Sequence, residues 1–381
     1  MKEGLRRAWR WVSVGAGSAA IGLAILIAVA LLVPGCGVGY LCRQSAAHLK
    51  VLAAREPVAD AIAAGKVPAE WLPRLDTIAD AKRFGAATLG LPTAKLYETI
   101  SLAKVGPTWI VTACPQDSLE PVTWWFPIVG RVPYKGDYDR AAAEKLAEQL
   151  REDGNDVQLY PASAFSSLGW FDDPIRPSML EGEDADIANL VLHESAHRVL
   201  YWKGVTDFNE SFATFVGDVG AIRYLEGRFG AGCEPCRRAQ AARADAPRFA
   251  DLIERTLARL RELYGEPVTR DEKLRLREEV FAWAREEHGR IAWNGEEYAG
   301  FRKRTLDNAV LLSYRRYGSG QDRFDAVLAR CEGDLARAIA FVRDSGWPEL
   351  PHSVRRATPP LDYLGQKLER GDPCPAASGK P

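Results

Sequence analysis

DIANLVLHESAHRVLYW, residues 186–202, is the stretch of sequence on which the fold prediction depends. Its apolar residues recur at helical spacing and predict a helix; they are Ile187, Leu190, Val191, Val199 and Leu200. His193 and His197 stand four residues apart, so a helix presents both imidazoles on one face.

The order His-Glu-x-x-His in this helix predicts a zinc site. Two imidazoles on one face can bind the same ion, so His193 and His197 are predicted ligands of Zn²⁺. Glu194 can then act as general base for a water molecule at the metal. The chain has only 5 histidines, so this spacing inside a predicted helix is informative. The alternative is a pair of surface histidines that binds no metal.

A catalytic zinc site needs a third protein ligand, and Glu210 is the predicted one. Gly204 breaks the first helix and the next begins near Asp207, which gives the two-His, one-Glu arrangement of thermolysin-like enzymes. Leu200 and Lys203 stand where a metzincin has Gly and His, which excludes that class. The alternative for Glu210 is a capping box with Asp207.

Weaker site predictions lie on either side of this helix. Asp218 could orient a ligand histidine, although an acidic residue on an exposed helix needs no such role. Upstream, residues 166–174 could pair with a substrate backbone, with Gly169 allowing close approach beside Trp170. The alternative is that Trp170 belongs to the core. The charged residues of 184–198 exclude an intramembrane protease.

The flanking sequence predicts an α+β fold that is predominantly helical, with a zincin-like catalytic core, a small β-sheet and the HExxH helix. Strands are predicted at 108–113, 122–129, 156–160 and 164–168. Helices are predicted within 44–104 and 300–343, at 139–153 and 207–225, and as a charged hairpin at 245–264 and 270–288. The predicted metallopeptidase domain spans 36–345, with its core at 107–230 and the hairpin at about 245–290. Residues 346–381 are predicted to form an irregular, proline-rich tail.

Several longer motifs carry a family resemblance. They are PVTWWFPIVG at 121–130, PYKG at 133–136, SLGWFDDP at 167–174, HESAH at 193–197 and FNESFATFVG at 208–217. With Asn308, Ala309 and Tyr314, they resemble a bacterial family described as putative zinc aminopeptidases, many of them predicted lipoproteins. The resemblance runs from about residue 36 to 342. It implies aminopeptidase activity on peptide substrates.

The amino terminus predicts export. Residues 1–10 are basic, residues 11–33 carry no charge, and this pattern indicates a signal peptide or a membrane anchor over residues 1–35. Cys36 follows Pro34 and Gly35 in the manner of a lipoprotein cleavage site, so lipidation at Cys36 and an uncleaved anchor are both open. Either leaves the chain on the periplasmic side of the cell membrane. A buried core helix is the third interpretation.

Composition limits the possible binding partners and the possible disulfide pairings. A net charge of −1 argues against nucleic-acid binding. Without Cys36 the chain has six cysteines, which allow fifteen pairings, and only Cys233–Cys236 is favoured, as a local disulfide. The sequence does not indicate an oligomeric state.

Together these patterns predict a zinc-dependent peptidase in which Glu194 activates water. An oxyanion donor is also expected, with Tyr314 as the candidate, although a tyrosine in the core is the commoner explanation. The competing hypothesis is a non-catalytic envelope protein with a structural metal site that binds a partner or a glycan.

Overall fold

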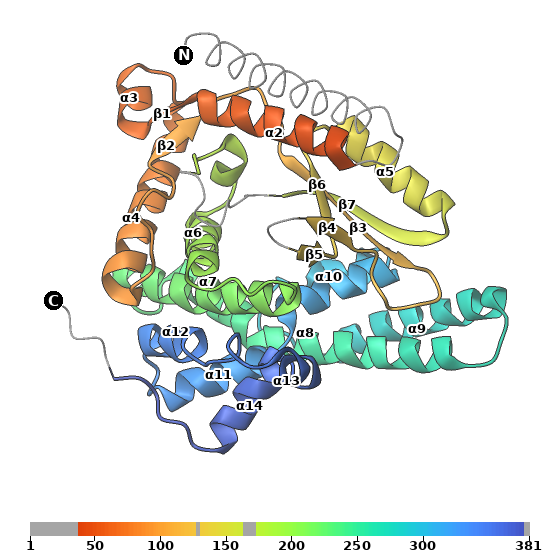
Figure 1. Ribbon diagram of the computed structural model, residues 1–381. Coiled ribbons are helices and arrows are strands. Elements are labelled where there is room, and N and C mark those ends of the chain that lie inside the picture. Colours follow the sequence, from red (N-terminus) through yellow and green to blue (C-terminus); the bar gives the residue numbers. More distant parts are fainter. Residues whose placement is uncertain (1–36, 127–129, 163–172, 377–381) are drawn as a thin grey trace, which may run out of the picture. The chain divides into compact units, whose positions relative to one another are not determined.

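The computed structural model describes residues 37–126, 130–162 and 173–376 (Figure 1). The described residues divide into two compact units, one from residues 37–54 with 103–105 and the other from residues 55–102 and the described part of 106–376. The described part of the first unit contains α2 (Gly37–Ala53), and all other elements belong to the second. Residues 1–36, predicted as leader and lipidation site, lie outside the described residues. Among the helices that are described, none has both the length and the apolar character needed to cross a bilayer.

The second unit is α+β and mostly helical, which confirms the predicted fold class at that level. Its α-helices are α3 (Val58–Ala63), α4 (Leu72–Leu89), α5 (Arg140–Glu152), α6 (Asp184–Val199), α7 (Thr206–Phe229), α8 (Glu234–Gly265), α9 (Arg270–Arg290), α10 (Asn308–Gly318), α11 (Gln321–Arg330), α12 (Leu335–Arg343), α13 (His352–Ala357) and α14 (Pro360–Glu369). Short 3₁₀ turns occupy Ala69–Trp71, Pro177–Leu180 and Ala299–Lys303. α8 begins earlier than the predicted 245, because Cys233 caps it and Pro235 occupies its first turn.

A three-stranded antiparallel sheet is covered by α5. β3 (Thr108–Pro115) is its central strand, between β6 (Lys135–Asp137) and β7 (Asn155–Ala162), so the strands predicted at 108–113 and 156–160 are present. Val111 and Val157 pack against Ala143 and Ala147 of α5 in a small core. β4 (Trp124–Phe126) pairs with β5 (Gly130–Val132). The strand predicted at 122–129 therefore extends only over β4 among the described residues, and the one predicted at 164–168 lies outside them.

A second small sheet corrects the prediction for residues 44–104. β1 (Arg55–Pro57) pairs with β2 (Thr99–Ser101) in a segment predicted to contain only helices and short breaks. Pro57 ends β1 and directly precedes α3, where its fixed φ suits the cap position.

The pair α6 and α7 forms the centre of the core. The two largest hydrophobic clusters contain side chains from both helices, among them Val191, Leu192 and Phe212. Two glycines of α7 allow the close approach: a Cβ at Gly217 would lie 3.2 Å from the carbonyl oxygen of Asn189, and one at Gly220 would lie 2.8 Å from Leu192 Cδ1. The helix predicted to carry the zinc site is thus held directly against the next one.

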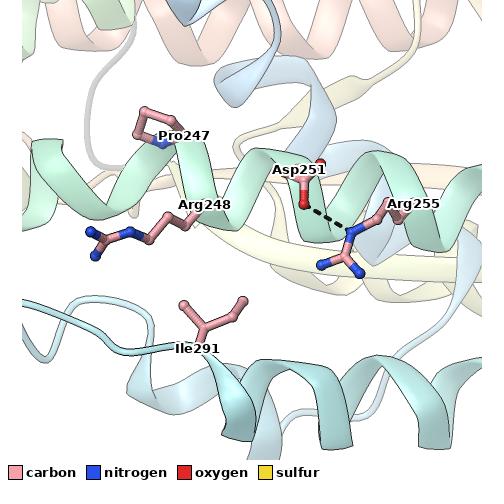
Figure 2. Close-up of a pocket in the computed structure, with 5 residues that line it drawn as sticks. All are labelled: Pro247, Arg248, Asp251, Arg255 and Ile291. Atoms are coloured by element: carbon pink, nitrogen blue, oxygen red, sulfur yellow. Dashed lines mark hydrogen bonds and ion pairs between the residues drawn. The ribbon is translucent and has the colours of Figure 1, made fainter.

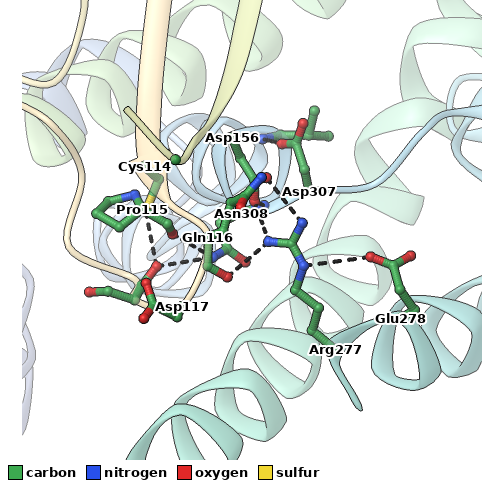
Figure 3. A network of polar contacts seen from close by, with 12 residues as sticks. Cys114, Pro115, Gln116, Asp117, Asp156, Arg277, Glu278, Asp307 and Asn308 are labelled. Atoms are coloured by element: carbon green, nitrogen blue, oxygen red, sulfur yellow. Dashed lines mark hydrogen bonds and ion pairs between the residues drawn. The ribbon is translucent and has the colours of Figure 1, made fainter. Parts of the chain in front are cut away.

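A buried polar network joins the sheet to the carboxyl-terminal helices (Figure 3). Asp156 of β7 accepts hydrogen bonds from both terminal nitrogens of Arg277, at 2.8 and 3.2 Å, and from the backbone N–H of Asn308 at 2.9 Å. Arg277 also donates to the carbonyl of Gln116, and the Asn308 amide donates to the carbonyl of Pro115. Each buried charge is therefore hydrogen-bonded as well as paired.

The tail is a correction to the sequence prediction. Residues 346–376 are not irregular, because α13 and α14 form there. Prolines start these helices instead of preventing them: Pro351 caps α13, while Pro359 and Pro360 occupy the cap and first turn of α14. A disulfide between Cys331 and Cys374 holds the tail to the end of α11. The predicted Cys233–Cys236 disulfide is also present.

Candidate metal centre

α6 and α7 bring three potential metal ligands together. Glu210 Oε2 lies 3.5 Å from His193 Nε2 and 3.6 Å from His197 Nε2. One ligand atom from each residue falls within 4.8 Å of the others. All three side chains are largely buried, with 15%, 7% and 11% of the surface exposed for His193, His197 and Glu210. Among the described residues, these three form the cluster of histidine and carboxylate side chains that could hold a metal ion.

The turn between the helices fixes how this triad is assembled. Asn209 is fully buried, and its Oδ1 accepts a hydrogen bond from the Trp202 N–H at 2.9 Å while its Nδ2 donates to the Trp202 carbonyl at 2.8 Å. The Trp202 ring also stacks on Phe208, with centroids 4.7 Å apart. These contacts hold the start of α7, and therefore Glu210, against the end of α6.

Glu210 does not act in a capping box. α7 begins at Thr206 with Val205 as its cap residue, so Asp207 already lies inside the helix. Burial alone would raise the pKa of Glu210, but hydrogen bonds from His193 and His197 outweigh it and hold this pKa well below its usual value. The same pairing raises the pKa of His197 against the effect of burial. The carboxylate thus faces the two imidazoles.

Glu194 lies in the same buried region, but its pKa shifts in the opposite direction from that of Glu210. Burial raises the pKa of Glu194, and His197 and His193 only partly offset that rise. Tyr97 is a neighbour: burial, Glu194 and Asp173 raise the pKa of its hydroxyl, which finds no hydrogen-bond partner in the described part of the chain. The Tyr97 backbone has φ 57°, in the left-handed region. Sequence patterns carry no signal for this residue, since nothing in its spacing relates it to α6.

Four tyrosines lie within electrostatic range of Glu210. Burial raises the pKa of each hydroxyl, and the Glu210 charge raises it further; for Tyr201 the value is about 12. The others are Tyr134, Tyr160 and Tyr317. Tyr201 follows His197 by four residues, a spacing that a longer helical pattern could have indicated. Tyr160 and Tyr317 come from β7 and α10, so only the fold brings them here.

Two residues proposed from sequence lie in other surroundings. Tyr314 packs against Phe249 and Phe301 in the core between α8 and α10, and its hydroxyl faces Arg304, so it is not the tyrosine near Glu210. Asp218 accepts a hydrogen bond from Asn189 at 2.7 Å and pairs with Arg243 at 3.7 Å. His193 lowers the pKa of Asp218 only as a smaller effect after burial, Arg243 and Asn189.

Gly169, Trp170 and Cys36 lie outside the described residues, and so does most of the proposed substrate-binding strand.

A shallow pocket lies along α8 on helices that carry none of the triad residues (Figure 2). Its lining consists of Pro247, Arg248, Asp251, Arg255 and Ile291. Asp251 and Arg255 form an ion pair at 2.8 Å within it, and Arg248 pairs with Asp245. These charges are satisfied by each other, so the pocket offers no evident ligand group. A second pocket adjoins the first turn of α7.

Comparison with known proteins identifies one relationship. Neither the curated proteins nor the solved structures yield a match to this chain. A family model described as "Putative aminopeptidase" matches residues 39–358, which include α6, α7 and the triad. The chain belongs to this family.

Proposed function

We propose that this protein is a zinc-dependent peptidase, and that it acts as an aminopeptidase. The observation that carries the proposal is the convergence of His193, His197 and Glu210 with Glu194 beside them. The family description supports peptides as the substrate class and release of amino-terminal residues as the reaction.

The donor set fits zinc. Ligand atoms about 2.0–2.1 Å from a tetrahedral zinc ion are about 3.4 Å apart. The observed separations of Glu210 Oε2 from the two imidazole nitrogens are 3.5 and 3.6 Å. Two nitrogens and one carboxylate oxygen are also the donors typical of catalytic zinc sites. Three ligands leave a tetrahedral ion one further position, whereas a structural site is closed by four protein ligands.

The side chains then have distinct roles. Zinc at this position supplies Lewis acidity, which polarises a peptide carbonyl and lowers the pKa of water. Glu194 accepts a proton from the attacking water and delivers it to the leaving amine nitrogen. The raised pKa of Glu194 suits a group that must both take up and release a proton. Tyr134 and Tyr201 keep neutral hydroxyls, which can donate hydrogen bonds to the charge that develops on the carbonyl oxygen.

Export and membrane attachment are part of the proposal. The basic and apolar residues 1–35 and Cys36 support a lipoprotein or an anchored protein on the periplasmic side of the membrane. The two disulfides support an oxidising compartment. Incorporation of radiolabelled lipid should disappear in Cys36→Ala, and labelling that persists in this variant would contradict lipidation at this cysteine.

The deciding experiment compares the wild type with Glu194→Gln. Metal content is measured first, followed by hydrolysis of aminoacyl substrates and of amino-terminally blocked peptides. Loss of the general base should lower kcat by about 10²- to 10⁴-fold while zinc remains bound. Glu181→Gln, a change at an exposed glutamate before α6, serves as the matched control and should keep full activity.

Undiminished hydrolysis by Glu194→Gln would contradict the mechanism. Cleavage of blocked peptides would instead show an endopeptidase with the same metal chemistry.

A further inference from the structure

A cavity at the first turn of α7 has an excess of positive charge. Its volume is about 400 Å³, and its charged lining residues are Arg131, Arg315, Arg316 and Asp207. The lining thus contains three arginines and one aspartate. Prolines and leucines, among them Pro133 and Leu361, supply the remaining apolar walls.

Arg316 is the unusual member of this lining. Its side chain is only 3% exposed, yet its Nε and Nη1 atoms have no hydrogen-bond partner among the residues that the structure describes. Asp207 lies near it, with Oδ1 at 3.4 Å from Nε, and Arg315 Nη2 lies 3.8 Å from the other Asp207 oxygen. Charge-assisted hydrogen bonds are normally about 2.7–2.9 Å long, so Asp207 offsets charge without satisfying either arginine.

The buried Arg277 provides a comparison within the same chain. Its Nε also has no hydrogen-bond partner among the described residues, but both terminal nitrogens make hydrogen bonds to Asp156, at 2.8 and 3.2 Å, and one also reaches the Gln116 carbonyl. The difference at Arg316 is therefore its unpartnered terminal nitrogen, Nη1. A guanidinium with unmade hydrogen bonds in a buried position is costly. An anion entering the cavity would supply the acceptors that Arg316 lacks.

The helix itself favours an anion at this place. Val205, Thr206, Asp207 and Phe208, at the start of the 24-residue helix α7, line the cavity, and the cap residue Val205 makes no side-chain hydrogen bond to this end. The N–H groups of a first helical turn and the positive end of the helix dipole both attract negative charge.

The cavity is close to the triad. Asp207 and Glu210 are three residues apart on one face of α7, which corresponds to about 4.5 Å along the helix axis. Tyr134 spans the two places: its ring centroid lies 5.8 Å from Arg316 Cζ, and its hydroxyl responds to the Glu210 charge. An extended peptide advances about 3.3–3.6 Å per residue, so one or two residues cover the axial separation of Asp207 and Glu210.

We propose that this cavity binds the carboxyl-terminal carboxylate of a short peptide substrate, with Arg316 as the main contact and Arg315 and Arg131 in support. The inference rests on the proposed peptidase function, and it makes di- and tripeptides the preferred substrates. Nη1 of Arg316 can donate a charge-assisted hydrogen bond to one oxygen of such a carboxylate, while Nε faces Asp207.

Binding is tested on the full-length, zinc-loaded Glu194→Gln protein, which should bind peptides without cleaving them. Isothermal titration calorimetry compares trialanine with trialanine amide, and the free acid should bind about tenfold more tightly. Adding Arg316→Met should remove this preference. Adding Arg275→Met should leave it unchanged, because Arg275 is an exposed arginine of α9 paired with Glu272 and Glu279. Thermal unfolding checks that each variant is folded. Arg315→Met, at a partly exposed position, should reduce the preference for trialanine over its amide about threefold.

Equal affinity for the acid and the amide in the parent protein would overturn the inference. Inorganic phosphate provides the second arm: if it binds in an Arg316-dependent manner while the two peptides bind equally, the cavity takes small anions and the peptide assignment is wrong. Hydrolysis by the wild type is measured separately. Peptide cleavage without a carboxylate preference contradicts only this inference, whereas a carboxylate preference without cleavage contradicts only the proposed function.

Discussion

Asn209 controls the geometry of the candidate site through two side-chain hydrogen bonds to the backbone of Trp202, which is not one of the predicted ligands. Its amide donates to and accepts from the same backbone residue, which closes the turn between α6 and α7. Glu210 is its direct neighbour in the chain. The position of one carboxylate oxygen in the triad therefore depends on an amide group on the preceding residue.

We expect Asn209→Asp to destabilise the protein by about 2–3 kcal/mol, since it removes the buried donor and adds a buried charge next to a carbonyl oxygen. Zinc affinity should fall as well. Urea unfolding and metal titration measure the two effects. Gln149→Glu, the same amide-to-acid change at an exposed site of α5, is the control and should alter neither quantity. An Asn209→Asp protein as stable as the wild type would show that the turn does not need this pair of bonds.

Asp245 gives a pH-dependent prediction. Burial would raise its pKa, but hydrogen bonds from the backbone N–H groups of Asn294 and Gly295, from the Asn294 side chain and from Arg248 outweigh it and lower the pKa. A lowered folded-state pKa means that the carboxylate stabilises the fold above the unfolded value of about 3.9, and that this contribution is lost as pH falls through the folded value.

We therefore expect Asp245→Asn to cost about 2 kcal/mol at pH 7, and the difference from wild type to shrink as pH falls below about 4. Urea unfolding of both proteins across this range measures it. A difference that stays constant down to pH 3 would mean that the charge of Asp245 contributes nothing.

Residue spacing predicted the members of the triad, because His193, Glu194 and His197 share one helix and Glu210 follows in the next. Tyr134, Tyr160, Tyr317 and Arg316 could not be found in this way. They come from the residue before β6, from β7 and from α10, and their common surroundings depend on how these segments pack. Tyr314 and Tyr317 illustrate the limit: both lie on α10, and the sequence indicated the one that packs in the core.

At the scale of the elements, the approach of α6 and α7 depends on positions without side chains. Gly217 faces the Asn189 backbone, so a methyl group there must separate two helices that each carry part of the triad. Gly227 lies on the same helix α7 with no atom within 4 Å of the place a Cβ would occupy. Gly217 and Gly227 therefore share the backbone of one helix, but only Gly217 is closely packed.

We expect Gly217→Ala to destabilise the protein by about 1–3 kcal/mol, since overpacking outweighs the gain in helix propensity. Gly227→Ala should stabilise it by up to about 1 kcal/mol, because only the propensity changes. Denaturant unfolding of both variants gives the comparison. A stabilising effect at both positions would show that the contact with Asn189 relaxes without cost.

The regular helices were predictable and the local exceptions were not. α5, α6, α7 and α9 follow apolar or charged helical patterns, and each begins and ends within a few residues of its predicted bounds. The strands β1 and β2 are three residues long, too short for an alternating pattern to appear. α14 was missed because a proline at the start of a helix and a proline in a loop look alike in sequence.

At the scale of the whole molecule, the two disulfides differ in how much chain they enclose. Cys233 and Cys236 are separated by 3 positions, and Cys331 and Cys374 by 43. The loop-entropy estimate gives about 2 kcal/mol for the first and about 4 kcal/mol for the second. The short spacing made the first bond predictable, whereas pairing across 43 positions is one of many connectivities and needs the fold to select it.

We expect the double variant Cys331→Ala/Cys374→Ala to lose about 2 kcal/mol more stability than Cys233→Ala/Cys236→Ala. Guanidinium unfolding under non-reducing conditions measures both. Cys331 is fully buried and packs with Leu335 and Phe324 in the core, which adds a cavity cost to its removal. Equal losses in the two variants would contradict the loop-length argument.

The Cys331–Cys374 bond also closes a covalent ring that contains α12, α13 and α14. A single proteolytic cut inside this ring breaks one peptide bond and leaves both fragments joined through sulfur. The nicked chain would migrate as one band on a gel without reductant and as two bands with it. In an oxidising compartment the protein would thus keep its carboxyl-terminal helices after a cut, and only reduction would release them.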